Sequence, residues 1–188
     1  MWSRSRCLNI GLRRTGTKYV MTSDADIILS PHYLADAVAT LQAHPLSVVC
    51  SPMLDLPRES TEALKRAAGE DGVLDAAAWR PRCTPRKGME LHPSAGVTFT
   101  GFHQAIRGYD EFYEGWGRED DDLMSRLMAV GIRMRAIPER SFYLHQWHPK
   151  FEGLEPSERR RVLERNSEHI QRSRSIVRND EDWGRMPA

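Results

Sequence analysis

The first half of the chain alternates short apolar runs with a helical spacing of apolar residues. Residues 19–22, Tyr-Val-Met-Thr, are aromatic and β-branched, which predicts a buried strand. Apolar residues then recur at helical spacing from 34 to 41, after Ser30 and Pro31, a pair that predicts the start of a helix. A second apolar run follows at 46–54. A strand, a helix and a second strand in this order favour an α/β fold with a parallel sheet.

The pattern changes after this unit and becomes regular again later. Residues 55–95 are rich in Pro, Arg and Gly and contain only short helical stretches, so we expect an excursion over the surface. Residues 120–130 form an apolar helical pattern that ends at Gly131, as helices commonly do. The remaining predicted elements are strands at 96–102, 132–138 and 141–146 and a polar, Arg-rich C-terminal helix at 155–178.

Length, charge and cysteines narrow the class of protein. A chain of 188 residues is expected to form one domain, 1–188, with a sizeable core. Its net charge of +1 gives no general attraction to nucleic acid or to an anionic membrane, and no apolar run approaches the roughly 20 residues of a membrane span. The three cysteines are far apart and have no metal-binding spacing, which indicates reduced thiols and a cytoplasmic location.

Two acids, Asp24 and Asp26, follow the first predicted strand directly. Ligands of α/β sheets bind beyond the carboxyl ends of the strands, so this position suits a metal or phosphate site. Two carboxylates one residue apart also offer hard oxygen ligands to Mg²⁺ or Mn²⁺. Taken alone, the Asp-Ala-Asp triplet favours a simpler interpretation, a loop cap ahead of the helix that begins near Ser30.

Four consecutive acids, Glu119 to Asp122, stand at the start of the helical pattern of residues 120–130. Acids in a first helical turn complement the helix dipole, but one or two would suffice, and four like charges repel. Trp116 and Gly117 stand just ahead of them; a Trp ring offers a flat apolar face to a sugar, and Gly permits close backbone approach. One acid can then act as a general base on an acceptor hydroxyl. The pattern therefore favours a catalytic role for these acids over helix capping alone.

Two histidines and several arginines complete the candidate chemistry. His145 and His148 are three residues apart near a predicted strand end, and imidazole binds Mn²⁺ alongside carboxylates. Metal binding and a structural role are equally compatible with this pair. Arg4 and Arg6 near the start could bind phosphates or could form a solvated face.

Together and in this order, these segments resemble the GT-A-fold glycosyltransferases of the family 2 type. The closest branches share a C-terminal half with β-1,4-galactosyltransferases and bacterial chondroitin-type polymerases. The resemblance covers most of the chain and rests on residues 3–34, on "GYDEFYEGWGREDDDLMSRLMAVG" at 108–131, and on "YLHQWHP" at 143–149. It implies a GT-A-like, Rossmann-like α/β fold with a mixed, mostly parallel sheet flanked by helices.

The resemblance also implies a function and the residues that perform it. Asp26 and His145, with His148 as the alternative, would bind Mn²⁺ or Mg²⁺ and thereby a nucleotide-diphosphate sugar, a UDP-sugar foremost. Asp120 would deprotonate the hydroxyl of a glycan or other acceptor, and the sugar would be transferred with inversion. The remaining implied contacts are Arg6, Asn9 and Asp24 toward the donor, and Trp116, Gly117, Glu119 and Asp121 toward the acceptor.

The resemblance further implies a partial GT-A domain. The family usually begins with two strand–helix units that carry the nucleotide-base pocket, and this chain starts inside the helix that follows them. The strand at 19–22 would then present an unpaired apolar edge, and such edges recruit partners. We therefore expect self-association or a partner chain at this edge. The alternative function is a non-catalytic carbohydrate-binding or assembly subunit, or a fragment, with the same fold.

Overall fold

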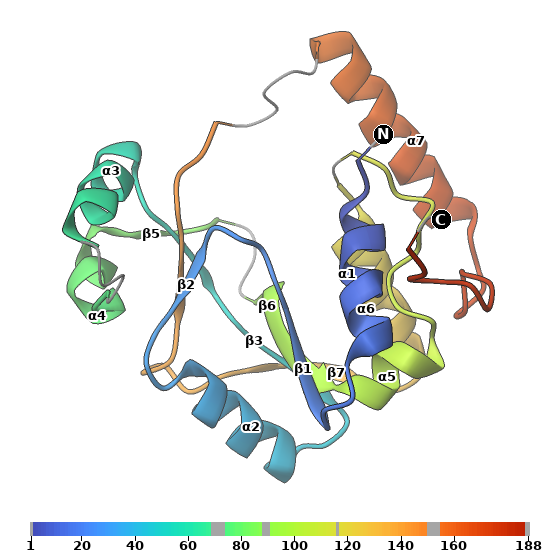
Figure 1. Ribbon diagram of the computed structural model, residues 1–188, viewed down its shortest axis with the longest axis horizontal. Coiled ribbons are helices and arrows are strands. Elements are labelled where there is room, and N and C mark those ends of the chain that lie inside the picture. The colour runs from blue at the N-terminus through green and yellow to red at the C-terminus, as the bar shows by residue number, and fades with distance from the viewer. Residues whose placement is uncertain (1, 69–73, 88–90, 116, 150–154, 187–188) are drawn as a thin grey trace. The chain divides into compact units, whose positions relative to one another are not determined.

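A computed structural model describes residues 2–68, 74–87, 91–115, 117–149 and 155–186 (Figure 1). The chain forms two compact units, each built from segments that are distant in sequence. The first unit comprises Met1–Val20, Thr98–Arg133 and Phe151–Ala188, and the second comprises Met21–Val97 and Met134–Lys150. Within the described ranges, no helix has both the length and the apolar character needed to cross a membrane.

Most residues of the strands belong to the second unit. They are β1 (Tyr19–Ser23), β2 (Ile27–Leu29), β3 (Ser47–Ser51), β4 (Met53–Asp55), β5 (Thr84–Pro85), β6 (His92–Phe99), β7 (Arg133–Ala136) and β8 (Tyr143–His145). They form two four-stranded sheets, with the orders β1-β6-β3-β7 and β2-β8-β4-β5. β1 stands at one end of its order, where we expect an exposed edge. Association through this edge stays a prediction.

The sheet with the order β2-β8-β4-β5 is mixed, as expected. β4 and β8 run parallel, whereas β3 pairs with β6, β2 with β8 and β4 with β5 in antiparallel directions. The predominance of parallel pairs that the sequence predicts is therefore not found in these four pairings. β2 follows β1 after a turn of a few residues and pairs with β8, a partner from far along the chain. Local strand–helix–strand patterns do not reveal such a pairing.

The helix α2 (Tyr33–Ala43) packs against β3, every residue of which is buried. The helix begins later than predicted, because Ser30 does not cap it. The Ser30 hydroxyl accepts a hydrogen bond from the backbone N–H of Phe142 at 3.0 Å, and His32 occupies the N-cap position without a side-chain cap. A tertiary contact has thus replaced the local cap that the sequence predicts.

The segment expected as a surface excursion contributes buried side chains. It contains α3 (Arg58–Ala67), α4 (Ala76–Trp79) and a short 3-10 helix, Arg80–Arg82, with α3 and α4 lying close to β5 (Figure 1). Apolar residues of this segment form a core cluster with β8 and the residue before it. The cluster consists of Leu56, Leu64, Ala76, Phe142 and Leu144.

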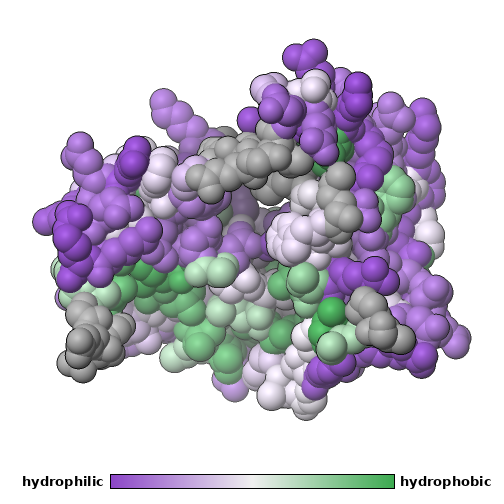
Figure 2. Space-filling view, turned by 45° about the horizontal axis from the view of Figure 1, so that its top comes forward, coloured by the Kyte–Doolittle hydropathy of each residue, from purple (hydrophilic) through white to green (hydrophobic). Residues whose placement is uncertain are grey.

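The first unit is helical. Its helices are α1 (Arg4–Arg14), α5 (Thr100–Ala105), α6 (Glu119–Ala129) and α7 (Pro156–Arg172). α1 packs beside α5 (Figure 1), and α6 matches the predicted helix 120–130, with Gly131 in the left-handed conformation after it. α7 ends at Arg172, earlier than the predicted 178. Figure 2 shows hydrophilic residues over much of one face of the molecule, with apolar residues in smaller areas.

A buried carboxylate ties α2 to the residues before β8. Asp36 accepts hydrogen bonds from Arg140 Nε at 2.7 Å and from Ser141 Oγ at 2.6 Å. These hydrogen bonds, that of Arg140 first, hold the pKa of Asp36 well below its ordinary value. A carboxyl whose pKa is lowered by folding stabilises the protein above its unfolded pKa of about 3.9, and this contribution is lost as the pH falls.

We therefore expect Asp36→Asn to lower the melting temperature by a few degrees at neutral pH. The difference from the wild type should begin to shrink as the pH falls through the unfolded pKa of about 3.9, and it should vanish only where the pH passes the lowered pKa of the folded carboxyl. Thermal unfolding followed by circular dichroism over this pH range measures both effects. Glu62→Gln, which removes a half-exposed carboxylate of α3, serves as control. A difference that persists unchanged at low pH would contradict this account.

A second buried carboxylate organises the first unit. Asp122 in α6 lies 2.7 Å from Arg126 Nε and 3.2 Å from Arg178 Nη2, and its side chain is 1 % exposed. Arg126 also donates to the backbone carbonyl of Gly108 at 2.9 Å. These contacts join α6 to the loop before it and to the C-terminal segment.

Asp122→Asn leaves two buried guanidinium groups beside a neutral amide, and breaking such a pair costs about 3–5 kcal/mol of unfolding free energy. Asp121→Asn removes a half-exposed carboxylate that pairs with Arg118, so we expect a loss below about 1 kcal/mol. Urea unfolding of both variants measures the two costs. Equal costs would show that burial of Asp122 does not decide its contribution.

Candidate functional site

The predicted metal ligands Asp26, His145 and His148 lie together in the second unit. Asp26 lies in the turn between β1 and β2, and β2 pairs with β8 so that Ile27 faces His145. Asp26 Oδ2 is 3.6 Å from His145 Nε2 and 3.2 Å from His148 Nε2. One ligand atom from each residue lies within 4.8 Å of the others. The structure thus brings both histidines, and not only one of them, to Asp26.

This arrangement fits a divalent cation. One carboxylate oxygen and two imidazole nitrogens form a ligand set that Mn²⁺ accepts. Asp26 Oδ1 is buried, and it finds no hydrogen-bond partner in the described part of the chain. Leaving a buried carboxylate oxygen unpaired costs free energy, and a bound cation would compensate that cost.

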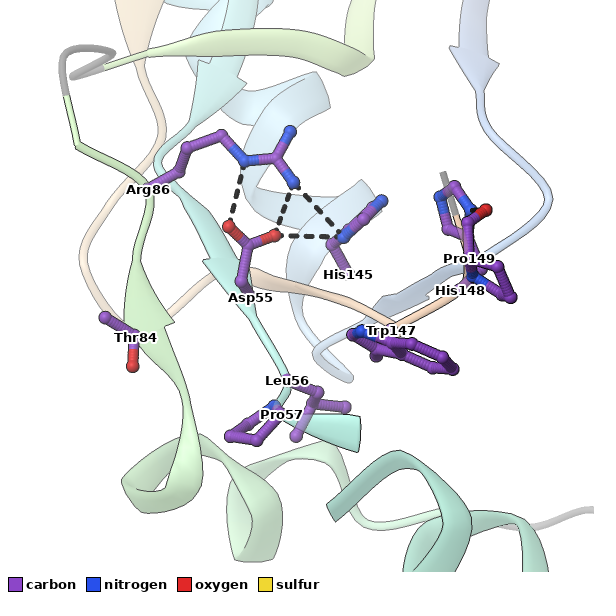
Figure 3. A pocket seen from close by; sticks show the side chains of 9 residues that line it. All are labelled: Asp55, Leu56, Pro57, Thr84, Arg86, His145, Trp147, His148 and Pro149. Atoms are coloured by element: carbon purple, nitrogen blue, oxygen red, sulfur yellow. Dashed lines mark hydrogen bonds and ion pairs between the residues drawn. The ribbon is translucent and has the colours of Figure 1, made fainter. Parts of the chain in front are cut away.

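Two charged residues, Asp55 and Arg86, lie at the Nδ1 atom of His145 (Figure 3). Asp55 Oδ1 lies 2.9 Å from this nitrogen, and Arg86 binds both oxygens of Asp55, at 2.9 Å through Nε and at 2.5 Å through Nη2. Burial lowers the pKa of His145 against the opposing charge of Asp26, and Arg86 lowers it further. Neutral imidazole is the form that binds metals.

Sequence analysis does not identify Asp55 or Arg86. Asp55 carries a detectable signal, because it is an acid directly after the predicted strand 46–54. Nothing in the sequence distinguishes Arg86 from the other arginines of its segment.

A pocket of about 410 Å³ opens beside the cluster. Trp147 in its wall is fixed by α3, because its backbone N–H donates to Thr61 Oγ1 at 2.9 Å and the Arg58 guanidinium lies 4.8 Å from the centre of its ring. The lining of the pocket consists of Asp55, Leu56, Pro57, Thr84, Arg86, His145, Trp147, His148 and Pro149 (Figure 3).

The predicted catalytic acids begin α6 in the first unit, and arginines pair with them. Asp120 Oδ1 lies 3.0 Å from Arg4 Nη1, and the same nitrogen lies 3.5 Å from Glu119 Oε1. Asp121 pairs with Arg118 at 3.0 Å. Burial raises the pKa of Glu119, and the negative charge of Asp120 raises it further. Sequence analysis considers Arg4 as a phosphate ligand, whereas here it orients the two acids.

The backbone ahead of α6 is left-handed at Gly117 and Arg118, with φ of 102° and 79°. Asn166 of α7 donates to the carbonyl of Gly117 at 2.9 Å, and a Cβ atom at Gly117 would lie 2.9 Å from Leu163 Cδ2. The φ of 102° favours glycine here, because residues with a side chain rarely adopt it. Its predicted contact with an acceptor stays a prediction, and Trp116 lies outside the described residues.

The predicted donor contacts are distributed over both units. Arg6 is half exposed, and its Nε lies 3.6 Å from Glu111 Oε2 in the first unit. Asp24 belongs to the second unit, where its backbone N–H donates to Ser94 O at 3.2 Å. The donor roles of these two side chains stay predictions.

Asn9 is fully buried and holds a loop of its own unit. Its side chain donates to the carbonyl of Tyr109 at 2.8 Å and to Glu111 at 3.0 Å, and it accepts from the N–H of Tyr109 at 2.8 Å. A Cβ atom at Gly108 would lie 2.2 Å from Asn9 Oδ1. These contacts give Asn9 a structural task, and its predicted contact with a donor stays untested.

A second hollow, of about 470 Å³, lies in the first unit. The polar groups that line it bind one another: His169 Nε2 lies 2.7 Å from Asp110 Oδ2, and Asn179 donates to the carbonyls of Arg107 and Tyr109 at 2.7 and 2.6 Å. This network stabilises the turn after α5, and we assign it no ligand.

Comparisons with known proteins identify a family and a fold. The model of glycosyl transferase family 2 matches residues 3–107, and the model described as the N-terminal domain of galactosyltransferase matches residues 97–149. A search of curated proteins finds no match. Among solved structures, the chain is similar to GalNAc-T7, crystallised with UDP, GalNAc and Mn²⁺, with a TM-score of 0.58 and 14% identity.

The similarity to GalNAc-T7 covers 89% of this chain and 34% of that one, so the chain spans about a third of the length of its structural relative. At this identity the similarity establishes the fold alone, and it confirms the expected GT-A-like α/β fold. The family 2 match covers more than half of the 188 residues. The chain therefore belongs to glycosyl transferase family 2.

Proposed function

We propose that this chain is a metal-dependent inverting glycosyltransferase, or the metal- and acceptor-binding part of one. It would move a sugar from a nucleotide-diphosphate sugar to an acceptor hydroxyl. The observation that carries the proposal is the convergence of Asp26, His145 and His148, whose ligand atoms lie within 4.8 Å of one another. Membership of glycosyl transferase family 2 supports the same reaction.

On the donor side, the chain supplies ligands that are already oriented. The backbone carbonyl of Asp26 accepts a hydrogen bond from Gln146 N–H at 2.9 Å, which keeps the turn of Asp26 beside the end of β8. Mn²⁺ or Mg²⁺ at Asp26, His145 and His148 would supply the positive charge that stabilises a departing diphosphate. The crystallisation of GalNAc-T7 with UDP and Mn²⁺ supports UDP and Mn²⁺ as the first choices to test.

On the acceptor side, Asp120 takes the proton of the acceptor hydroxyl. The acceptor oxygen then forms its bond to the anomeric carbon while the bond to the diphosphate breaks on the opposite face, so the configuration inverts. Arg4, 3.0 Å from Asp120, keeps the carboxylate oriented. Glu119 and Asp121 bind other acceptor hydroxyls, and Trp116 and Gly117 shape the space for the sugar rings.

The alternative is a subunit that binds nucleotide sugar or glycan without turnover. It would use the same metal cluster, so binding alone does not separate the two functions. Turnover that depends on Asp120 does.

We expect the purified chain to release UDP from one of a panel of UDP-sugars in the presence of Mn²⁺ and sugar acceptors. Asp120→Asn should lower this turnover about 100-fold or more, because general-base catalysis contributes about 10²–10⁴-fold. Asp182→Asn removes an exposed carboxylate that pairs with Arg185 and serves as matched control. Circular dichroism confirms that each variant is folded.

Unchanged turnover in folded Asp120→Asn would remove Asp120 from the mechanism. Binding of a UDP-sugar by the wild type without any release of UDP would favour the non-catalytic alternative.

A further inference from the structure

The Nδ1 atom of His145 faces two groups of opposite charge. Asp55 Oδ1 lies 2.9 Å away and Arg86 Nη2 lies 3.3 Å away. A guanidinium only donates hydrogen bonds, and an ionised carboxylate only accepts them. An unprotonated Nδ1 would place two acceptors 2.9 Å apart, so the contacts favour a proton on Nδ1 that is donated to Asp55.

This protonation determines what the other ring nitrogen can do. With the proton on Nδ1, the lone pair of Nε2 is free, and Nε2 is the atom that faces Asp26 Oδ2 at 3.6 Å. With the proton on Nε2, His145 could not bind a cation through this atom. The partner of Nδ1 therefore decides whether His145 can act as a ligand at this cluster.

The sheet explains why Asp55 occupies this place. Asp55 stands opposite His145 in the parallel β4–β8 pair and opposite Thr84 in the antiparallel β4–β5 pair. Residues in register on neighbouring strands present their side chains on the same face. Arg86 follows just after β5, and its backbone N–H donates to the carbonyl of Met53.

Arg86 fixes the direction of the Asp55 carboxylate. Its fork contacts both carboxylate oxygens, at 2.9 Å and 2.5 Å, and a two-point contact of this kind determines orientation as well as distance. Asp55 and Arg86 are each about one-third exposed and line the pocket, whereas the possible cation ligands in the described residues are Asp26, His145 and His148.

We propose that Asp55 and Arg86 are positioning residues, which hold His145 in the Nδ1-protonated form so that Nε2 completes the cation site with Asp26 and His148. The pair acts through His145 and does not touch the cation. The inference rests on the proposed metal-dependent function and extends it to two residues that family resemblance does not assign.

Binding of Mn²⁺ alone tests the inference without any turnover. Electron paramagnetic resonance of free Mn²⁺, titrated with the full chain, gives the dissociation constant. Asp55→Ala should weaken Mn²⁺ binding about ten- to hundredfold, as loss of such supporting partners commonly does. Arg86→Lys should also weaken it, because lysine keeps the charge but cannot hold both carboxylate oxygens.

Two further variants separate positioning from general destabilisation. Glu62→Ala removes a half-exposed carboxylate from α3 in the same unit and should leave the Mn²⁺ affinity unchanged. Asp55→Asn keeps an oxygen that can accept from Nδ1–H, so its loss of affinity should be smaller than that of Asp55→Ala. The proposal is overturned if Arg86→Lys and a folded Asp55 variant, either Asp55→Ala or Asp55→Asn, bind Mn²⁺ as tightly as the wild type.

The protonated nitrogen of His145 can be observed directly in the metal-free chain. Long-range ¹H–¹⁵N correlation at about pH 8, above the ordinary imidazole pKa of about 6.5, distinguishes the two neutral forms. The wild type should show the proton on Nδ1, and Asp55→Ala should shift it toward Nε2, the form that histidine prefers in water. A merely structural role of Asp55 would leave this signature unchanged, and that result would also overturn the proposal.

These readouts distinguish a failure of this inference from a failure of the proposed function. If the wild type binds Mn²⁺ and Asp26→Ala does not, the cation site stands, and unchanged binding in the Asp55 and Arg86 variants removes only their positioning role. If the folded wild type does not bind Mn²⁺, both the metal-dependent function and this inference are wrong.

Discussion

The candidate site depends on the antiparallel pairing of β2 with β8. Its register sets Ile27 opposite His145, so the turn that carries Asp26 lies beside the end of β8. β8 also pairs with β4, which places Asp55 opposite the same histidine. A shift of one residue in either pairing would turn His145 to the other face of the sheet and separate it from its partners. Three short strands thus bring Asp26, His145 and Asp55 beside one another.

Arginines pair with the acids in each unit. The chain has almost equal numbers of basic and acidic residues, so its net charge is +1 despite dense acidic clusters. In the run Glu119 to Asp122, Asp121 has Arg118, and Asp122 has Arg126 and Arg178. Glu119 and Asp120 instead share Arg4. Two acids that share one arginine are more than helix capping requires. This agrees with the proposed roles of Asp120 as general base and of Glu119 as a contact of the acceptor.

The sequence predicts those parts of the fold in which local patterns are strong. The helix at 120–130 appears as expected, and a strand forms at Tyr19–Thr22, although only Thr22 of it is buried and not the whole strand as predicted. The prediction that Ser30 caps the following helix was wrong, because its hydroxyl accepts a hydrogen bond from the backbone N–H of Phe142, a residue far along the chain. Motif order predicted Asp26 and His145, with His148 as the alternative, and the structure places all three residues together. Asp55 and Arg86 could not be assigned, because only the pairing of β4 with both β8 and β5 brings them to His145.

The proposed donor site requires Asp26 as a ligand of its cation. Calorimetric titration of UDP into the purified protein, with and without Mn²⁺ and again with Asp26→Ala, measures this requirement. We expect UDP to bind only when both Mn²⁺ and Asp26 are present. Binding that is unaffected by removal of Mn²⁺ or by Asp26→Ala would exclude this role of Asp26, as would a folded wild type that binds no UDP.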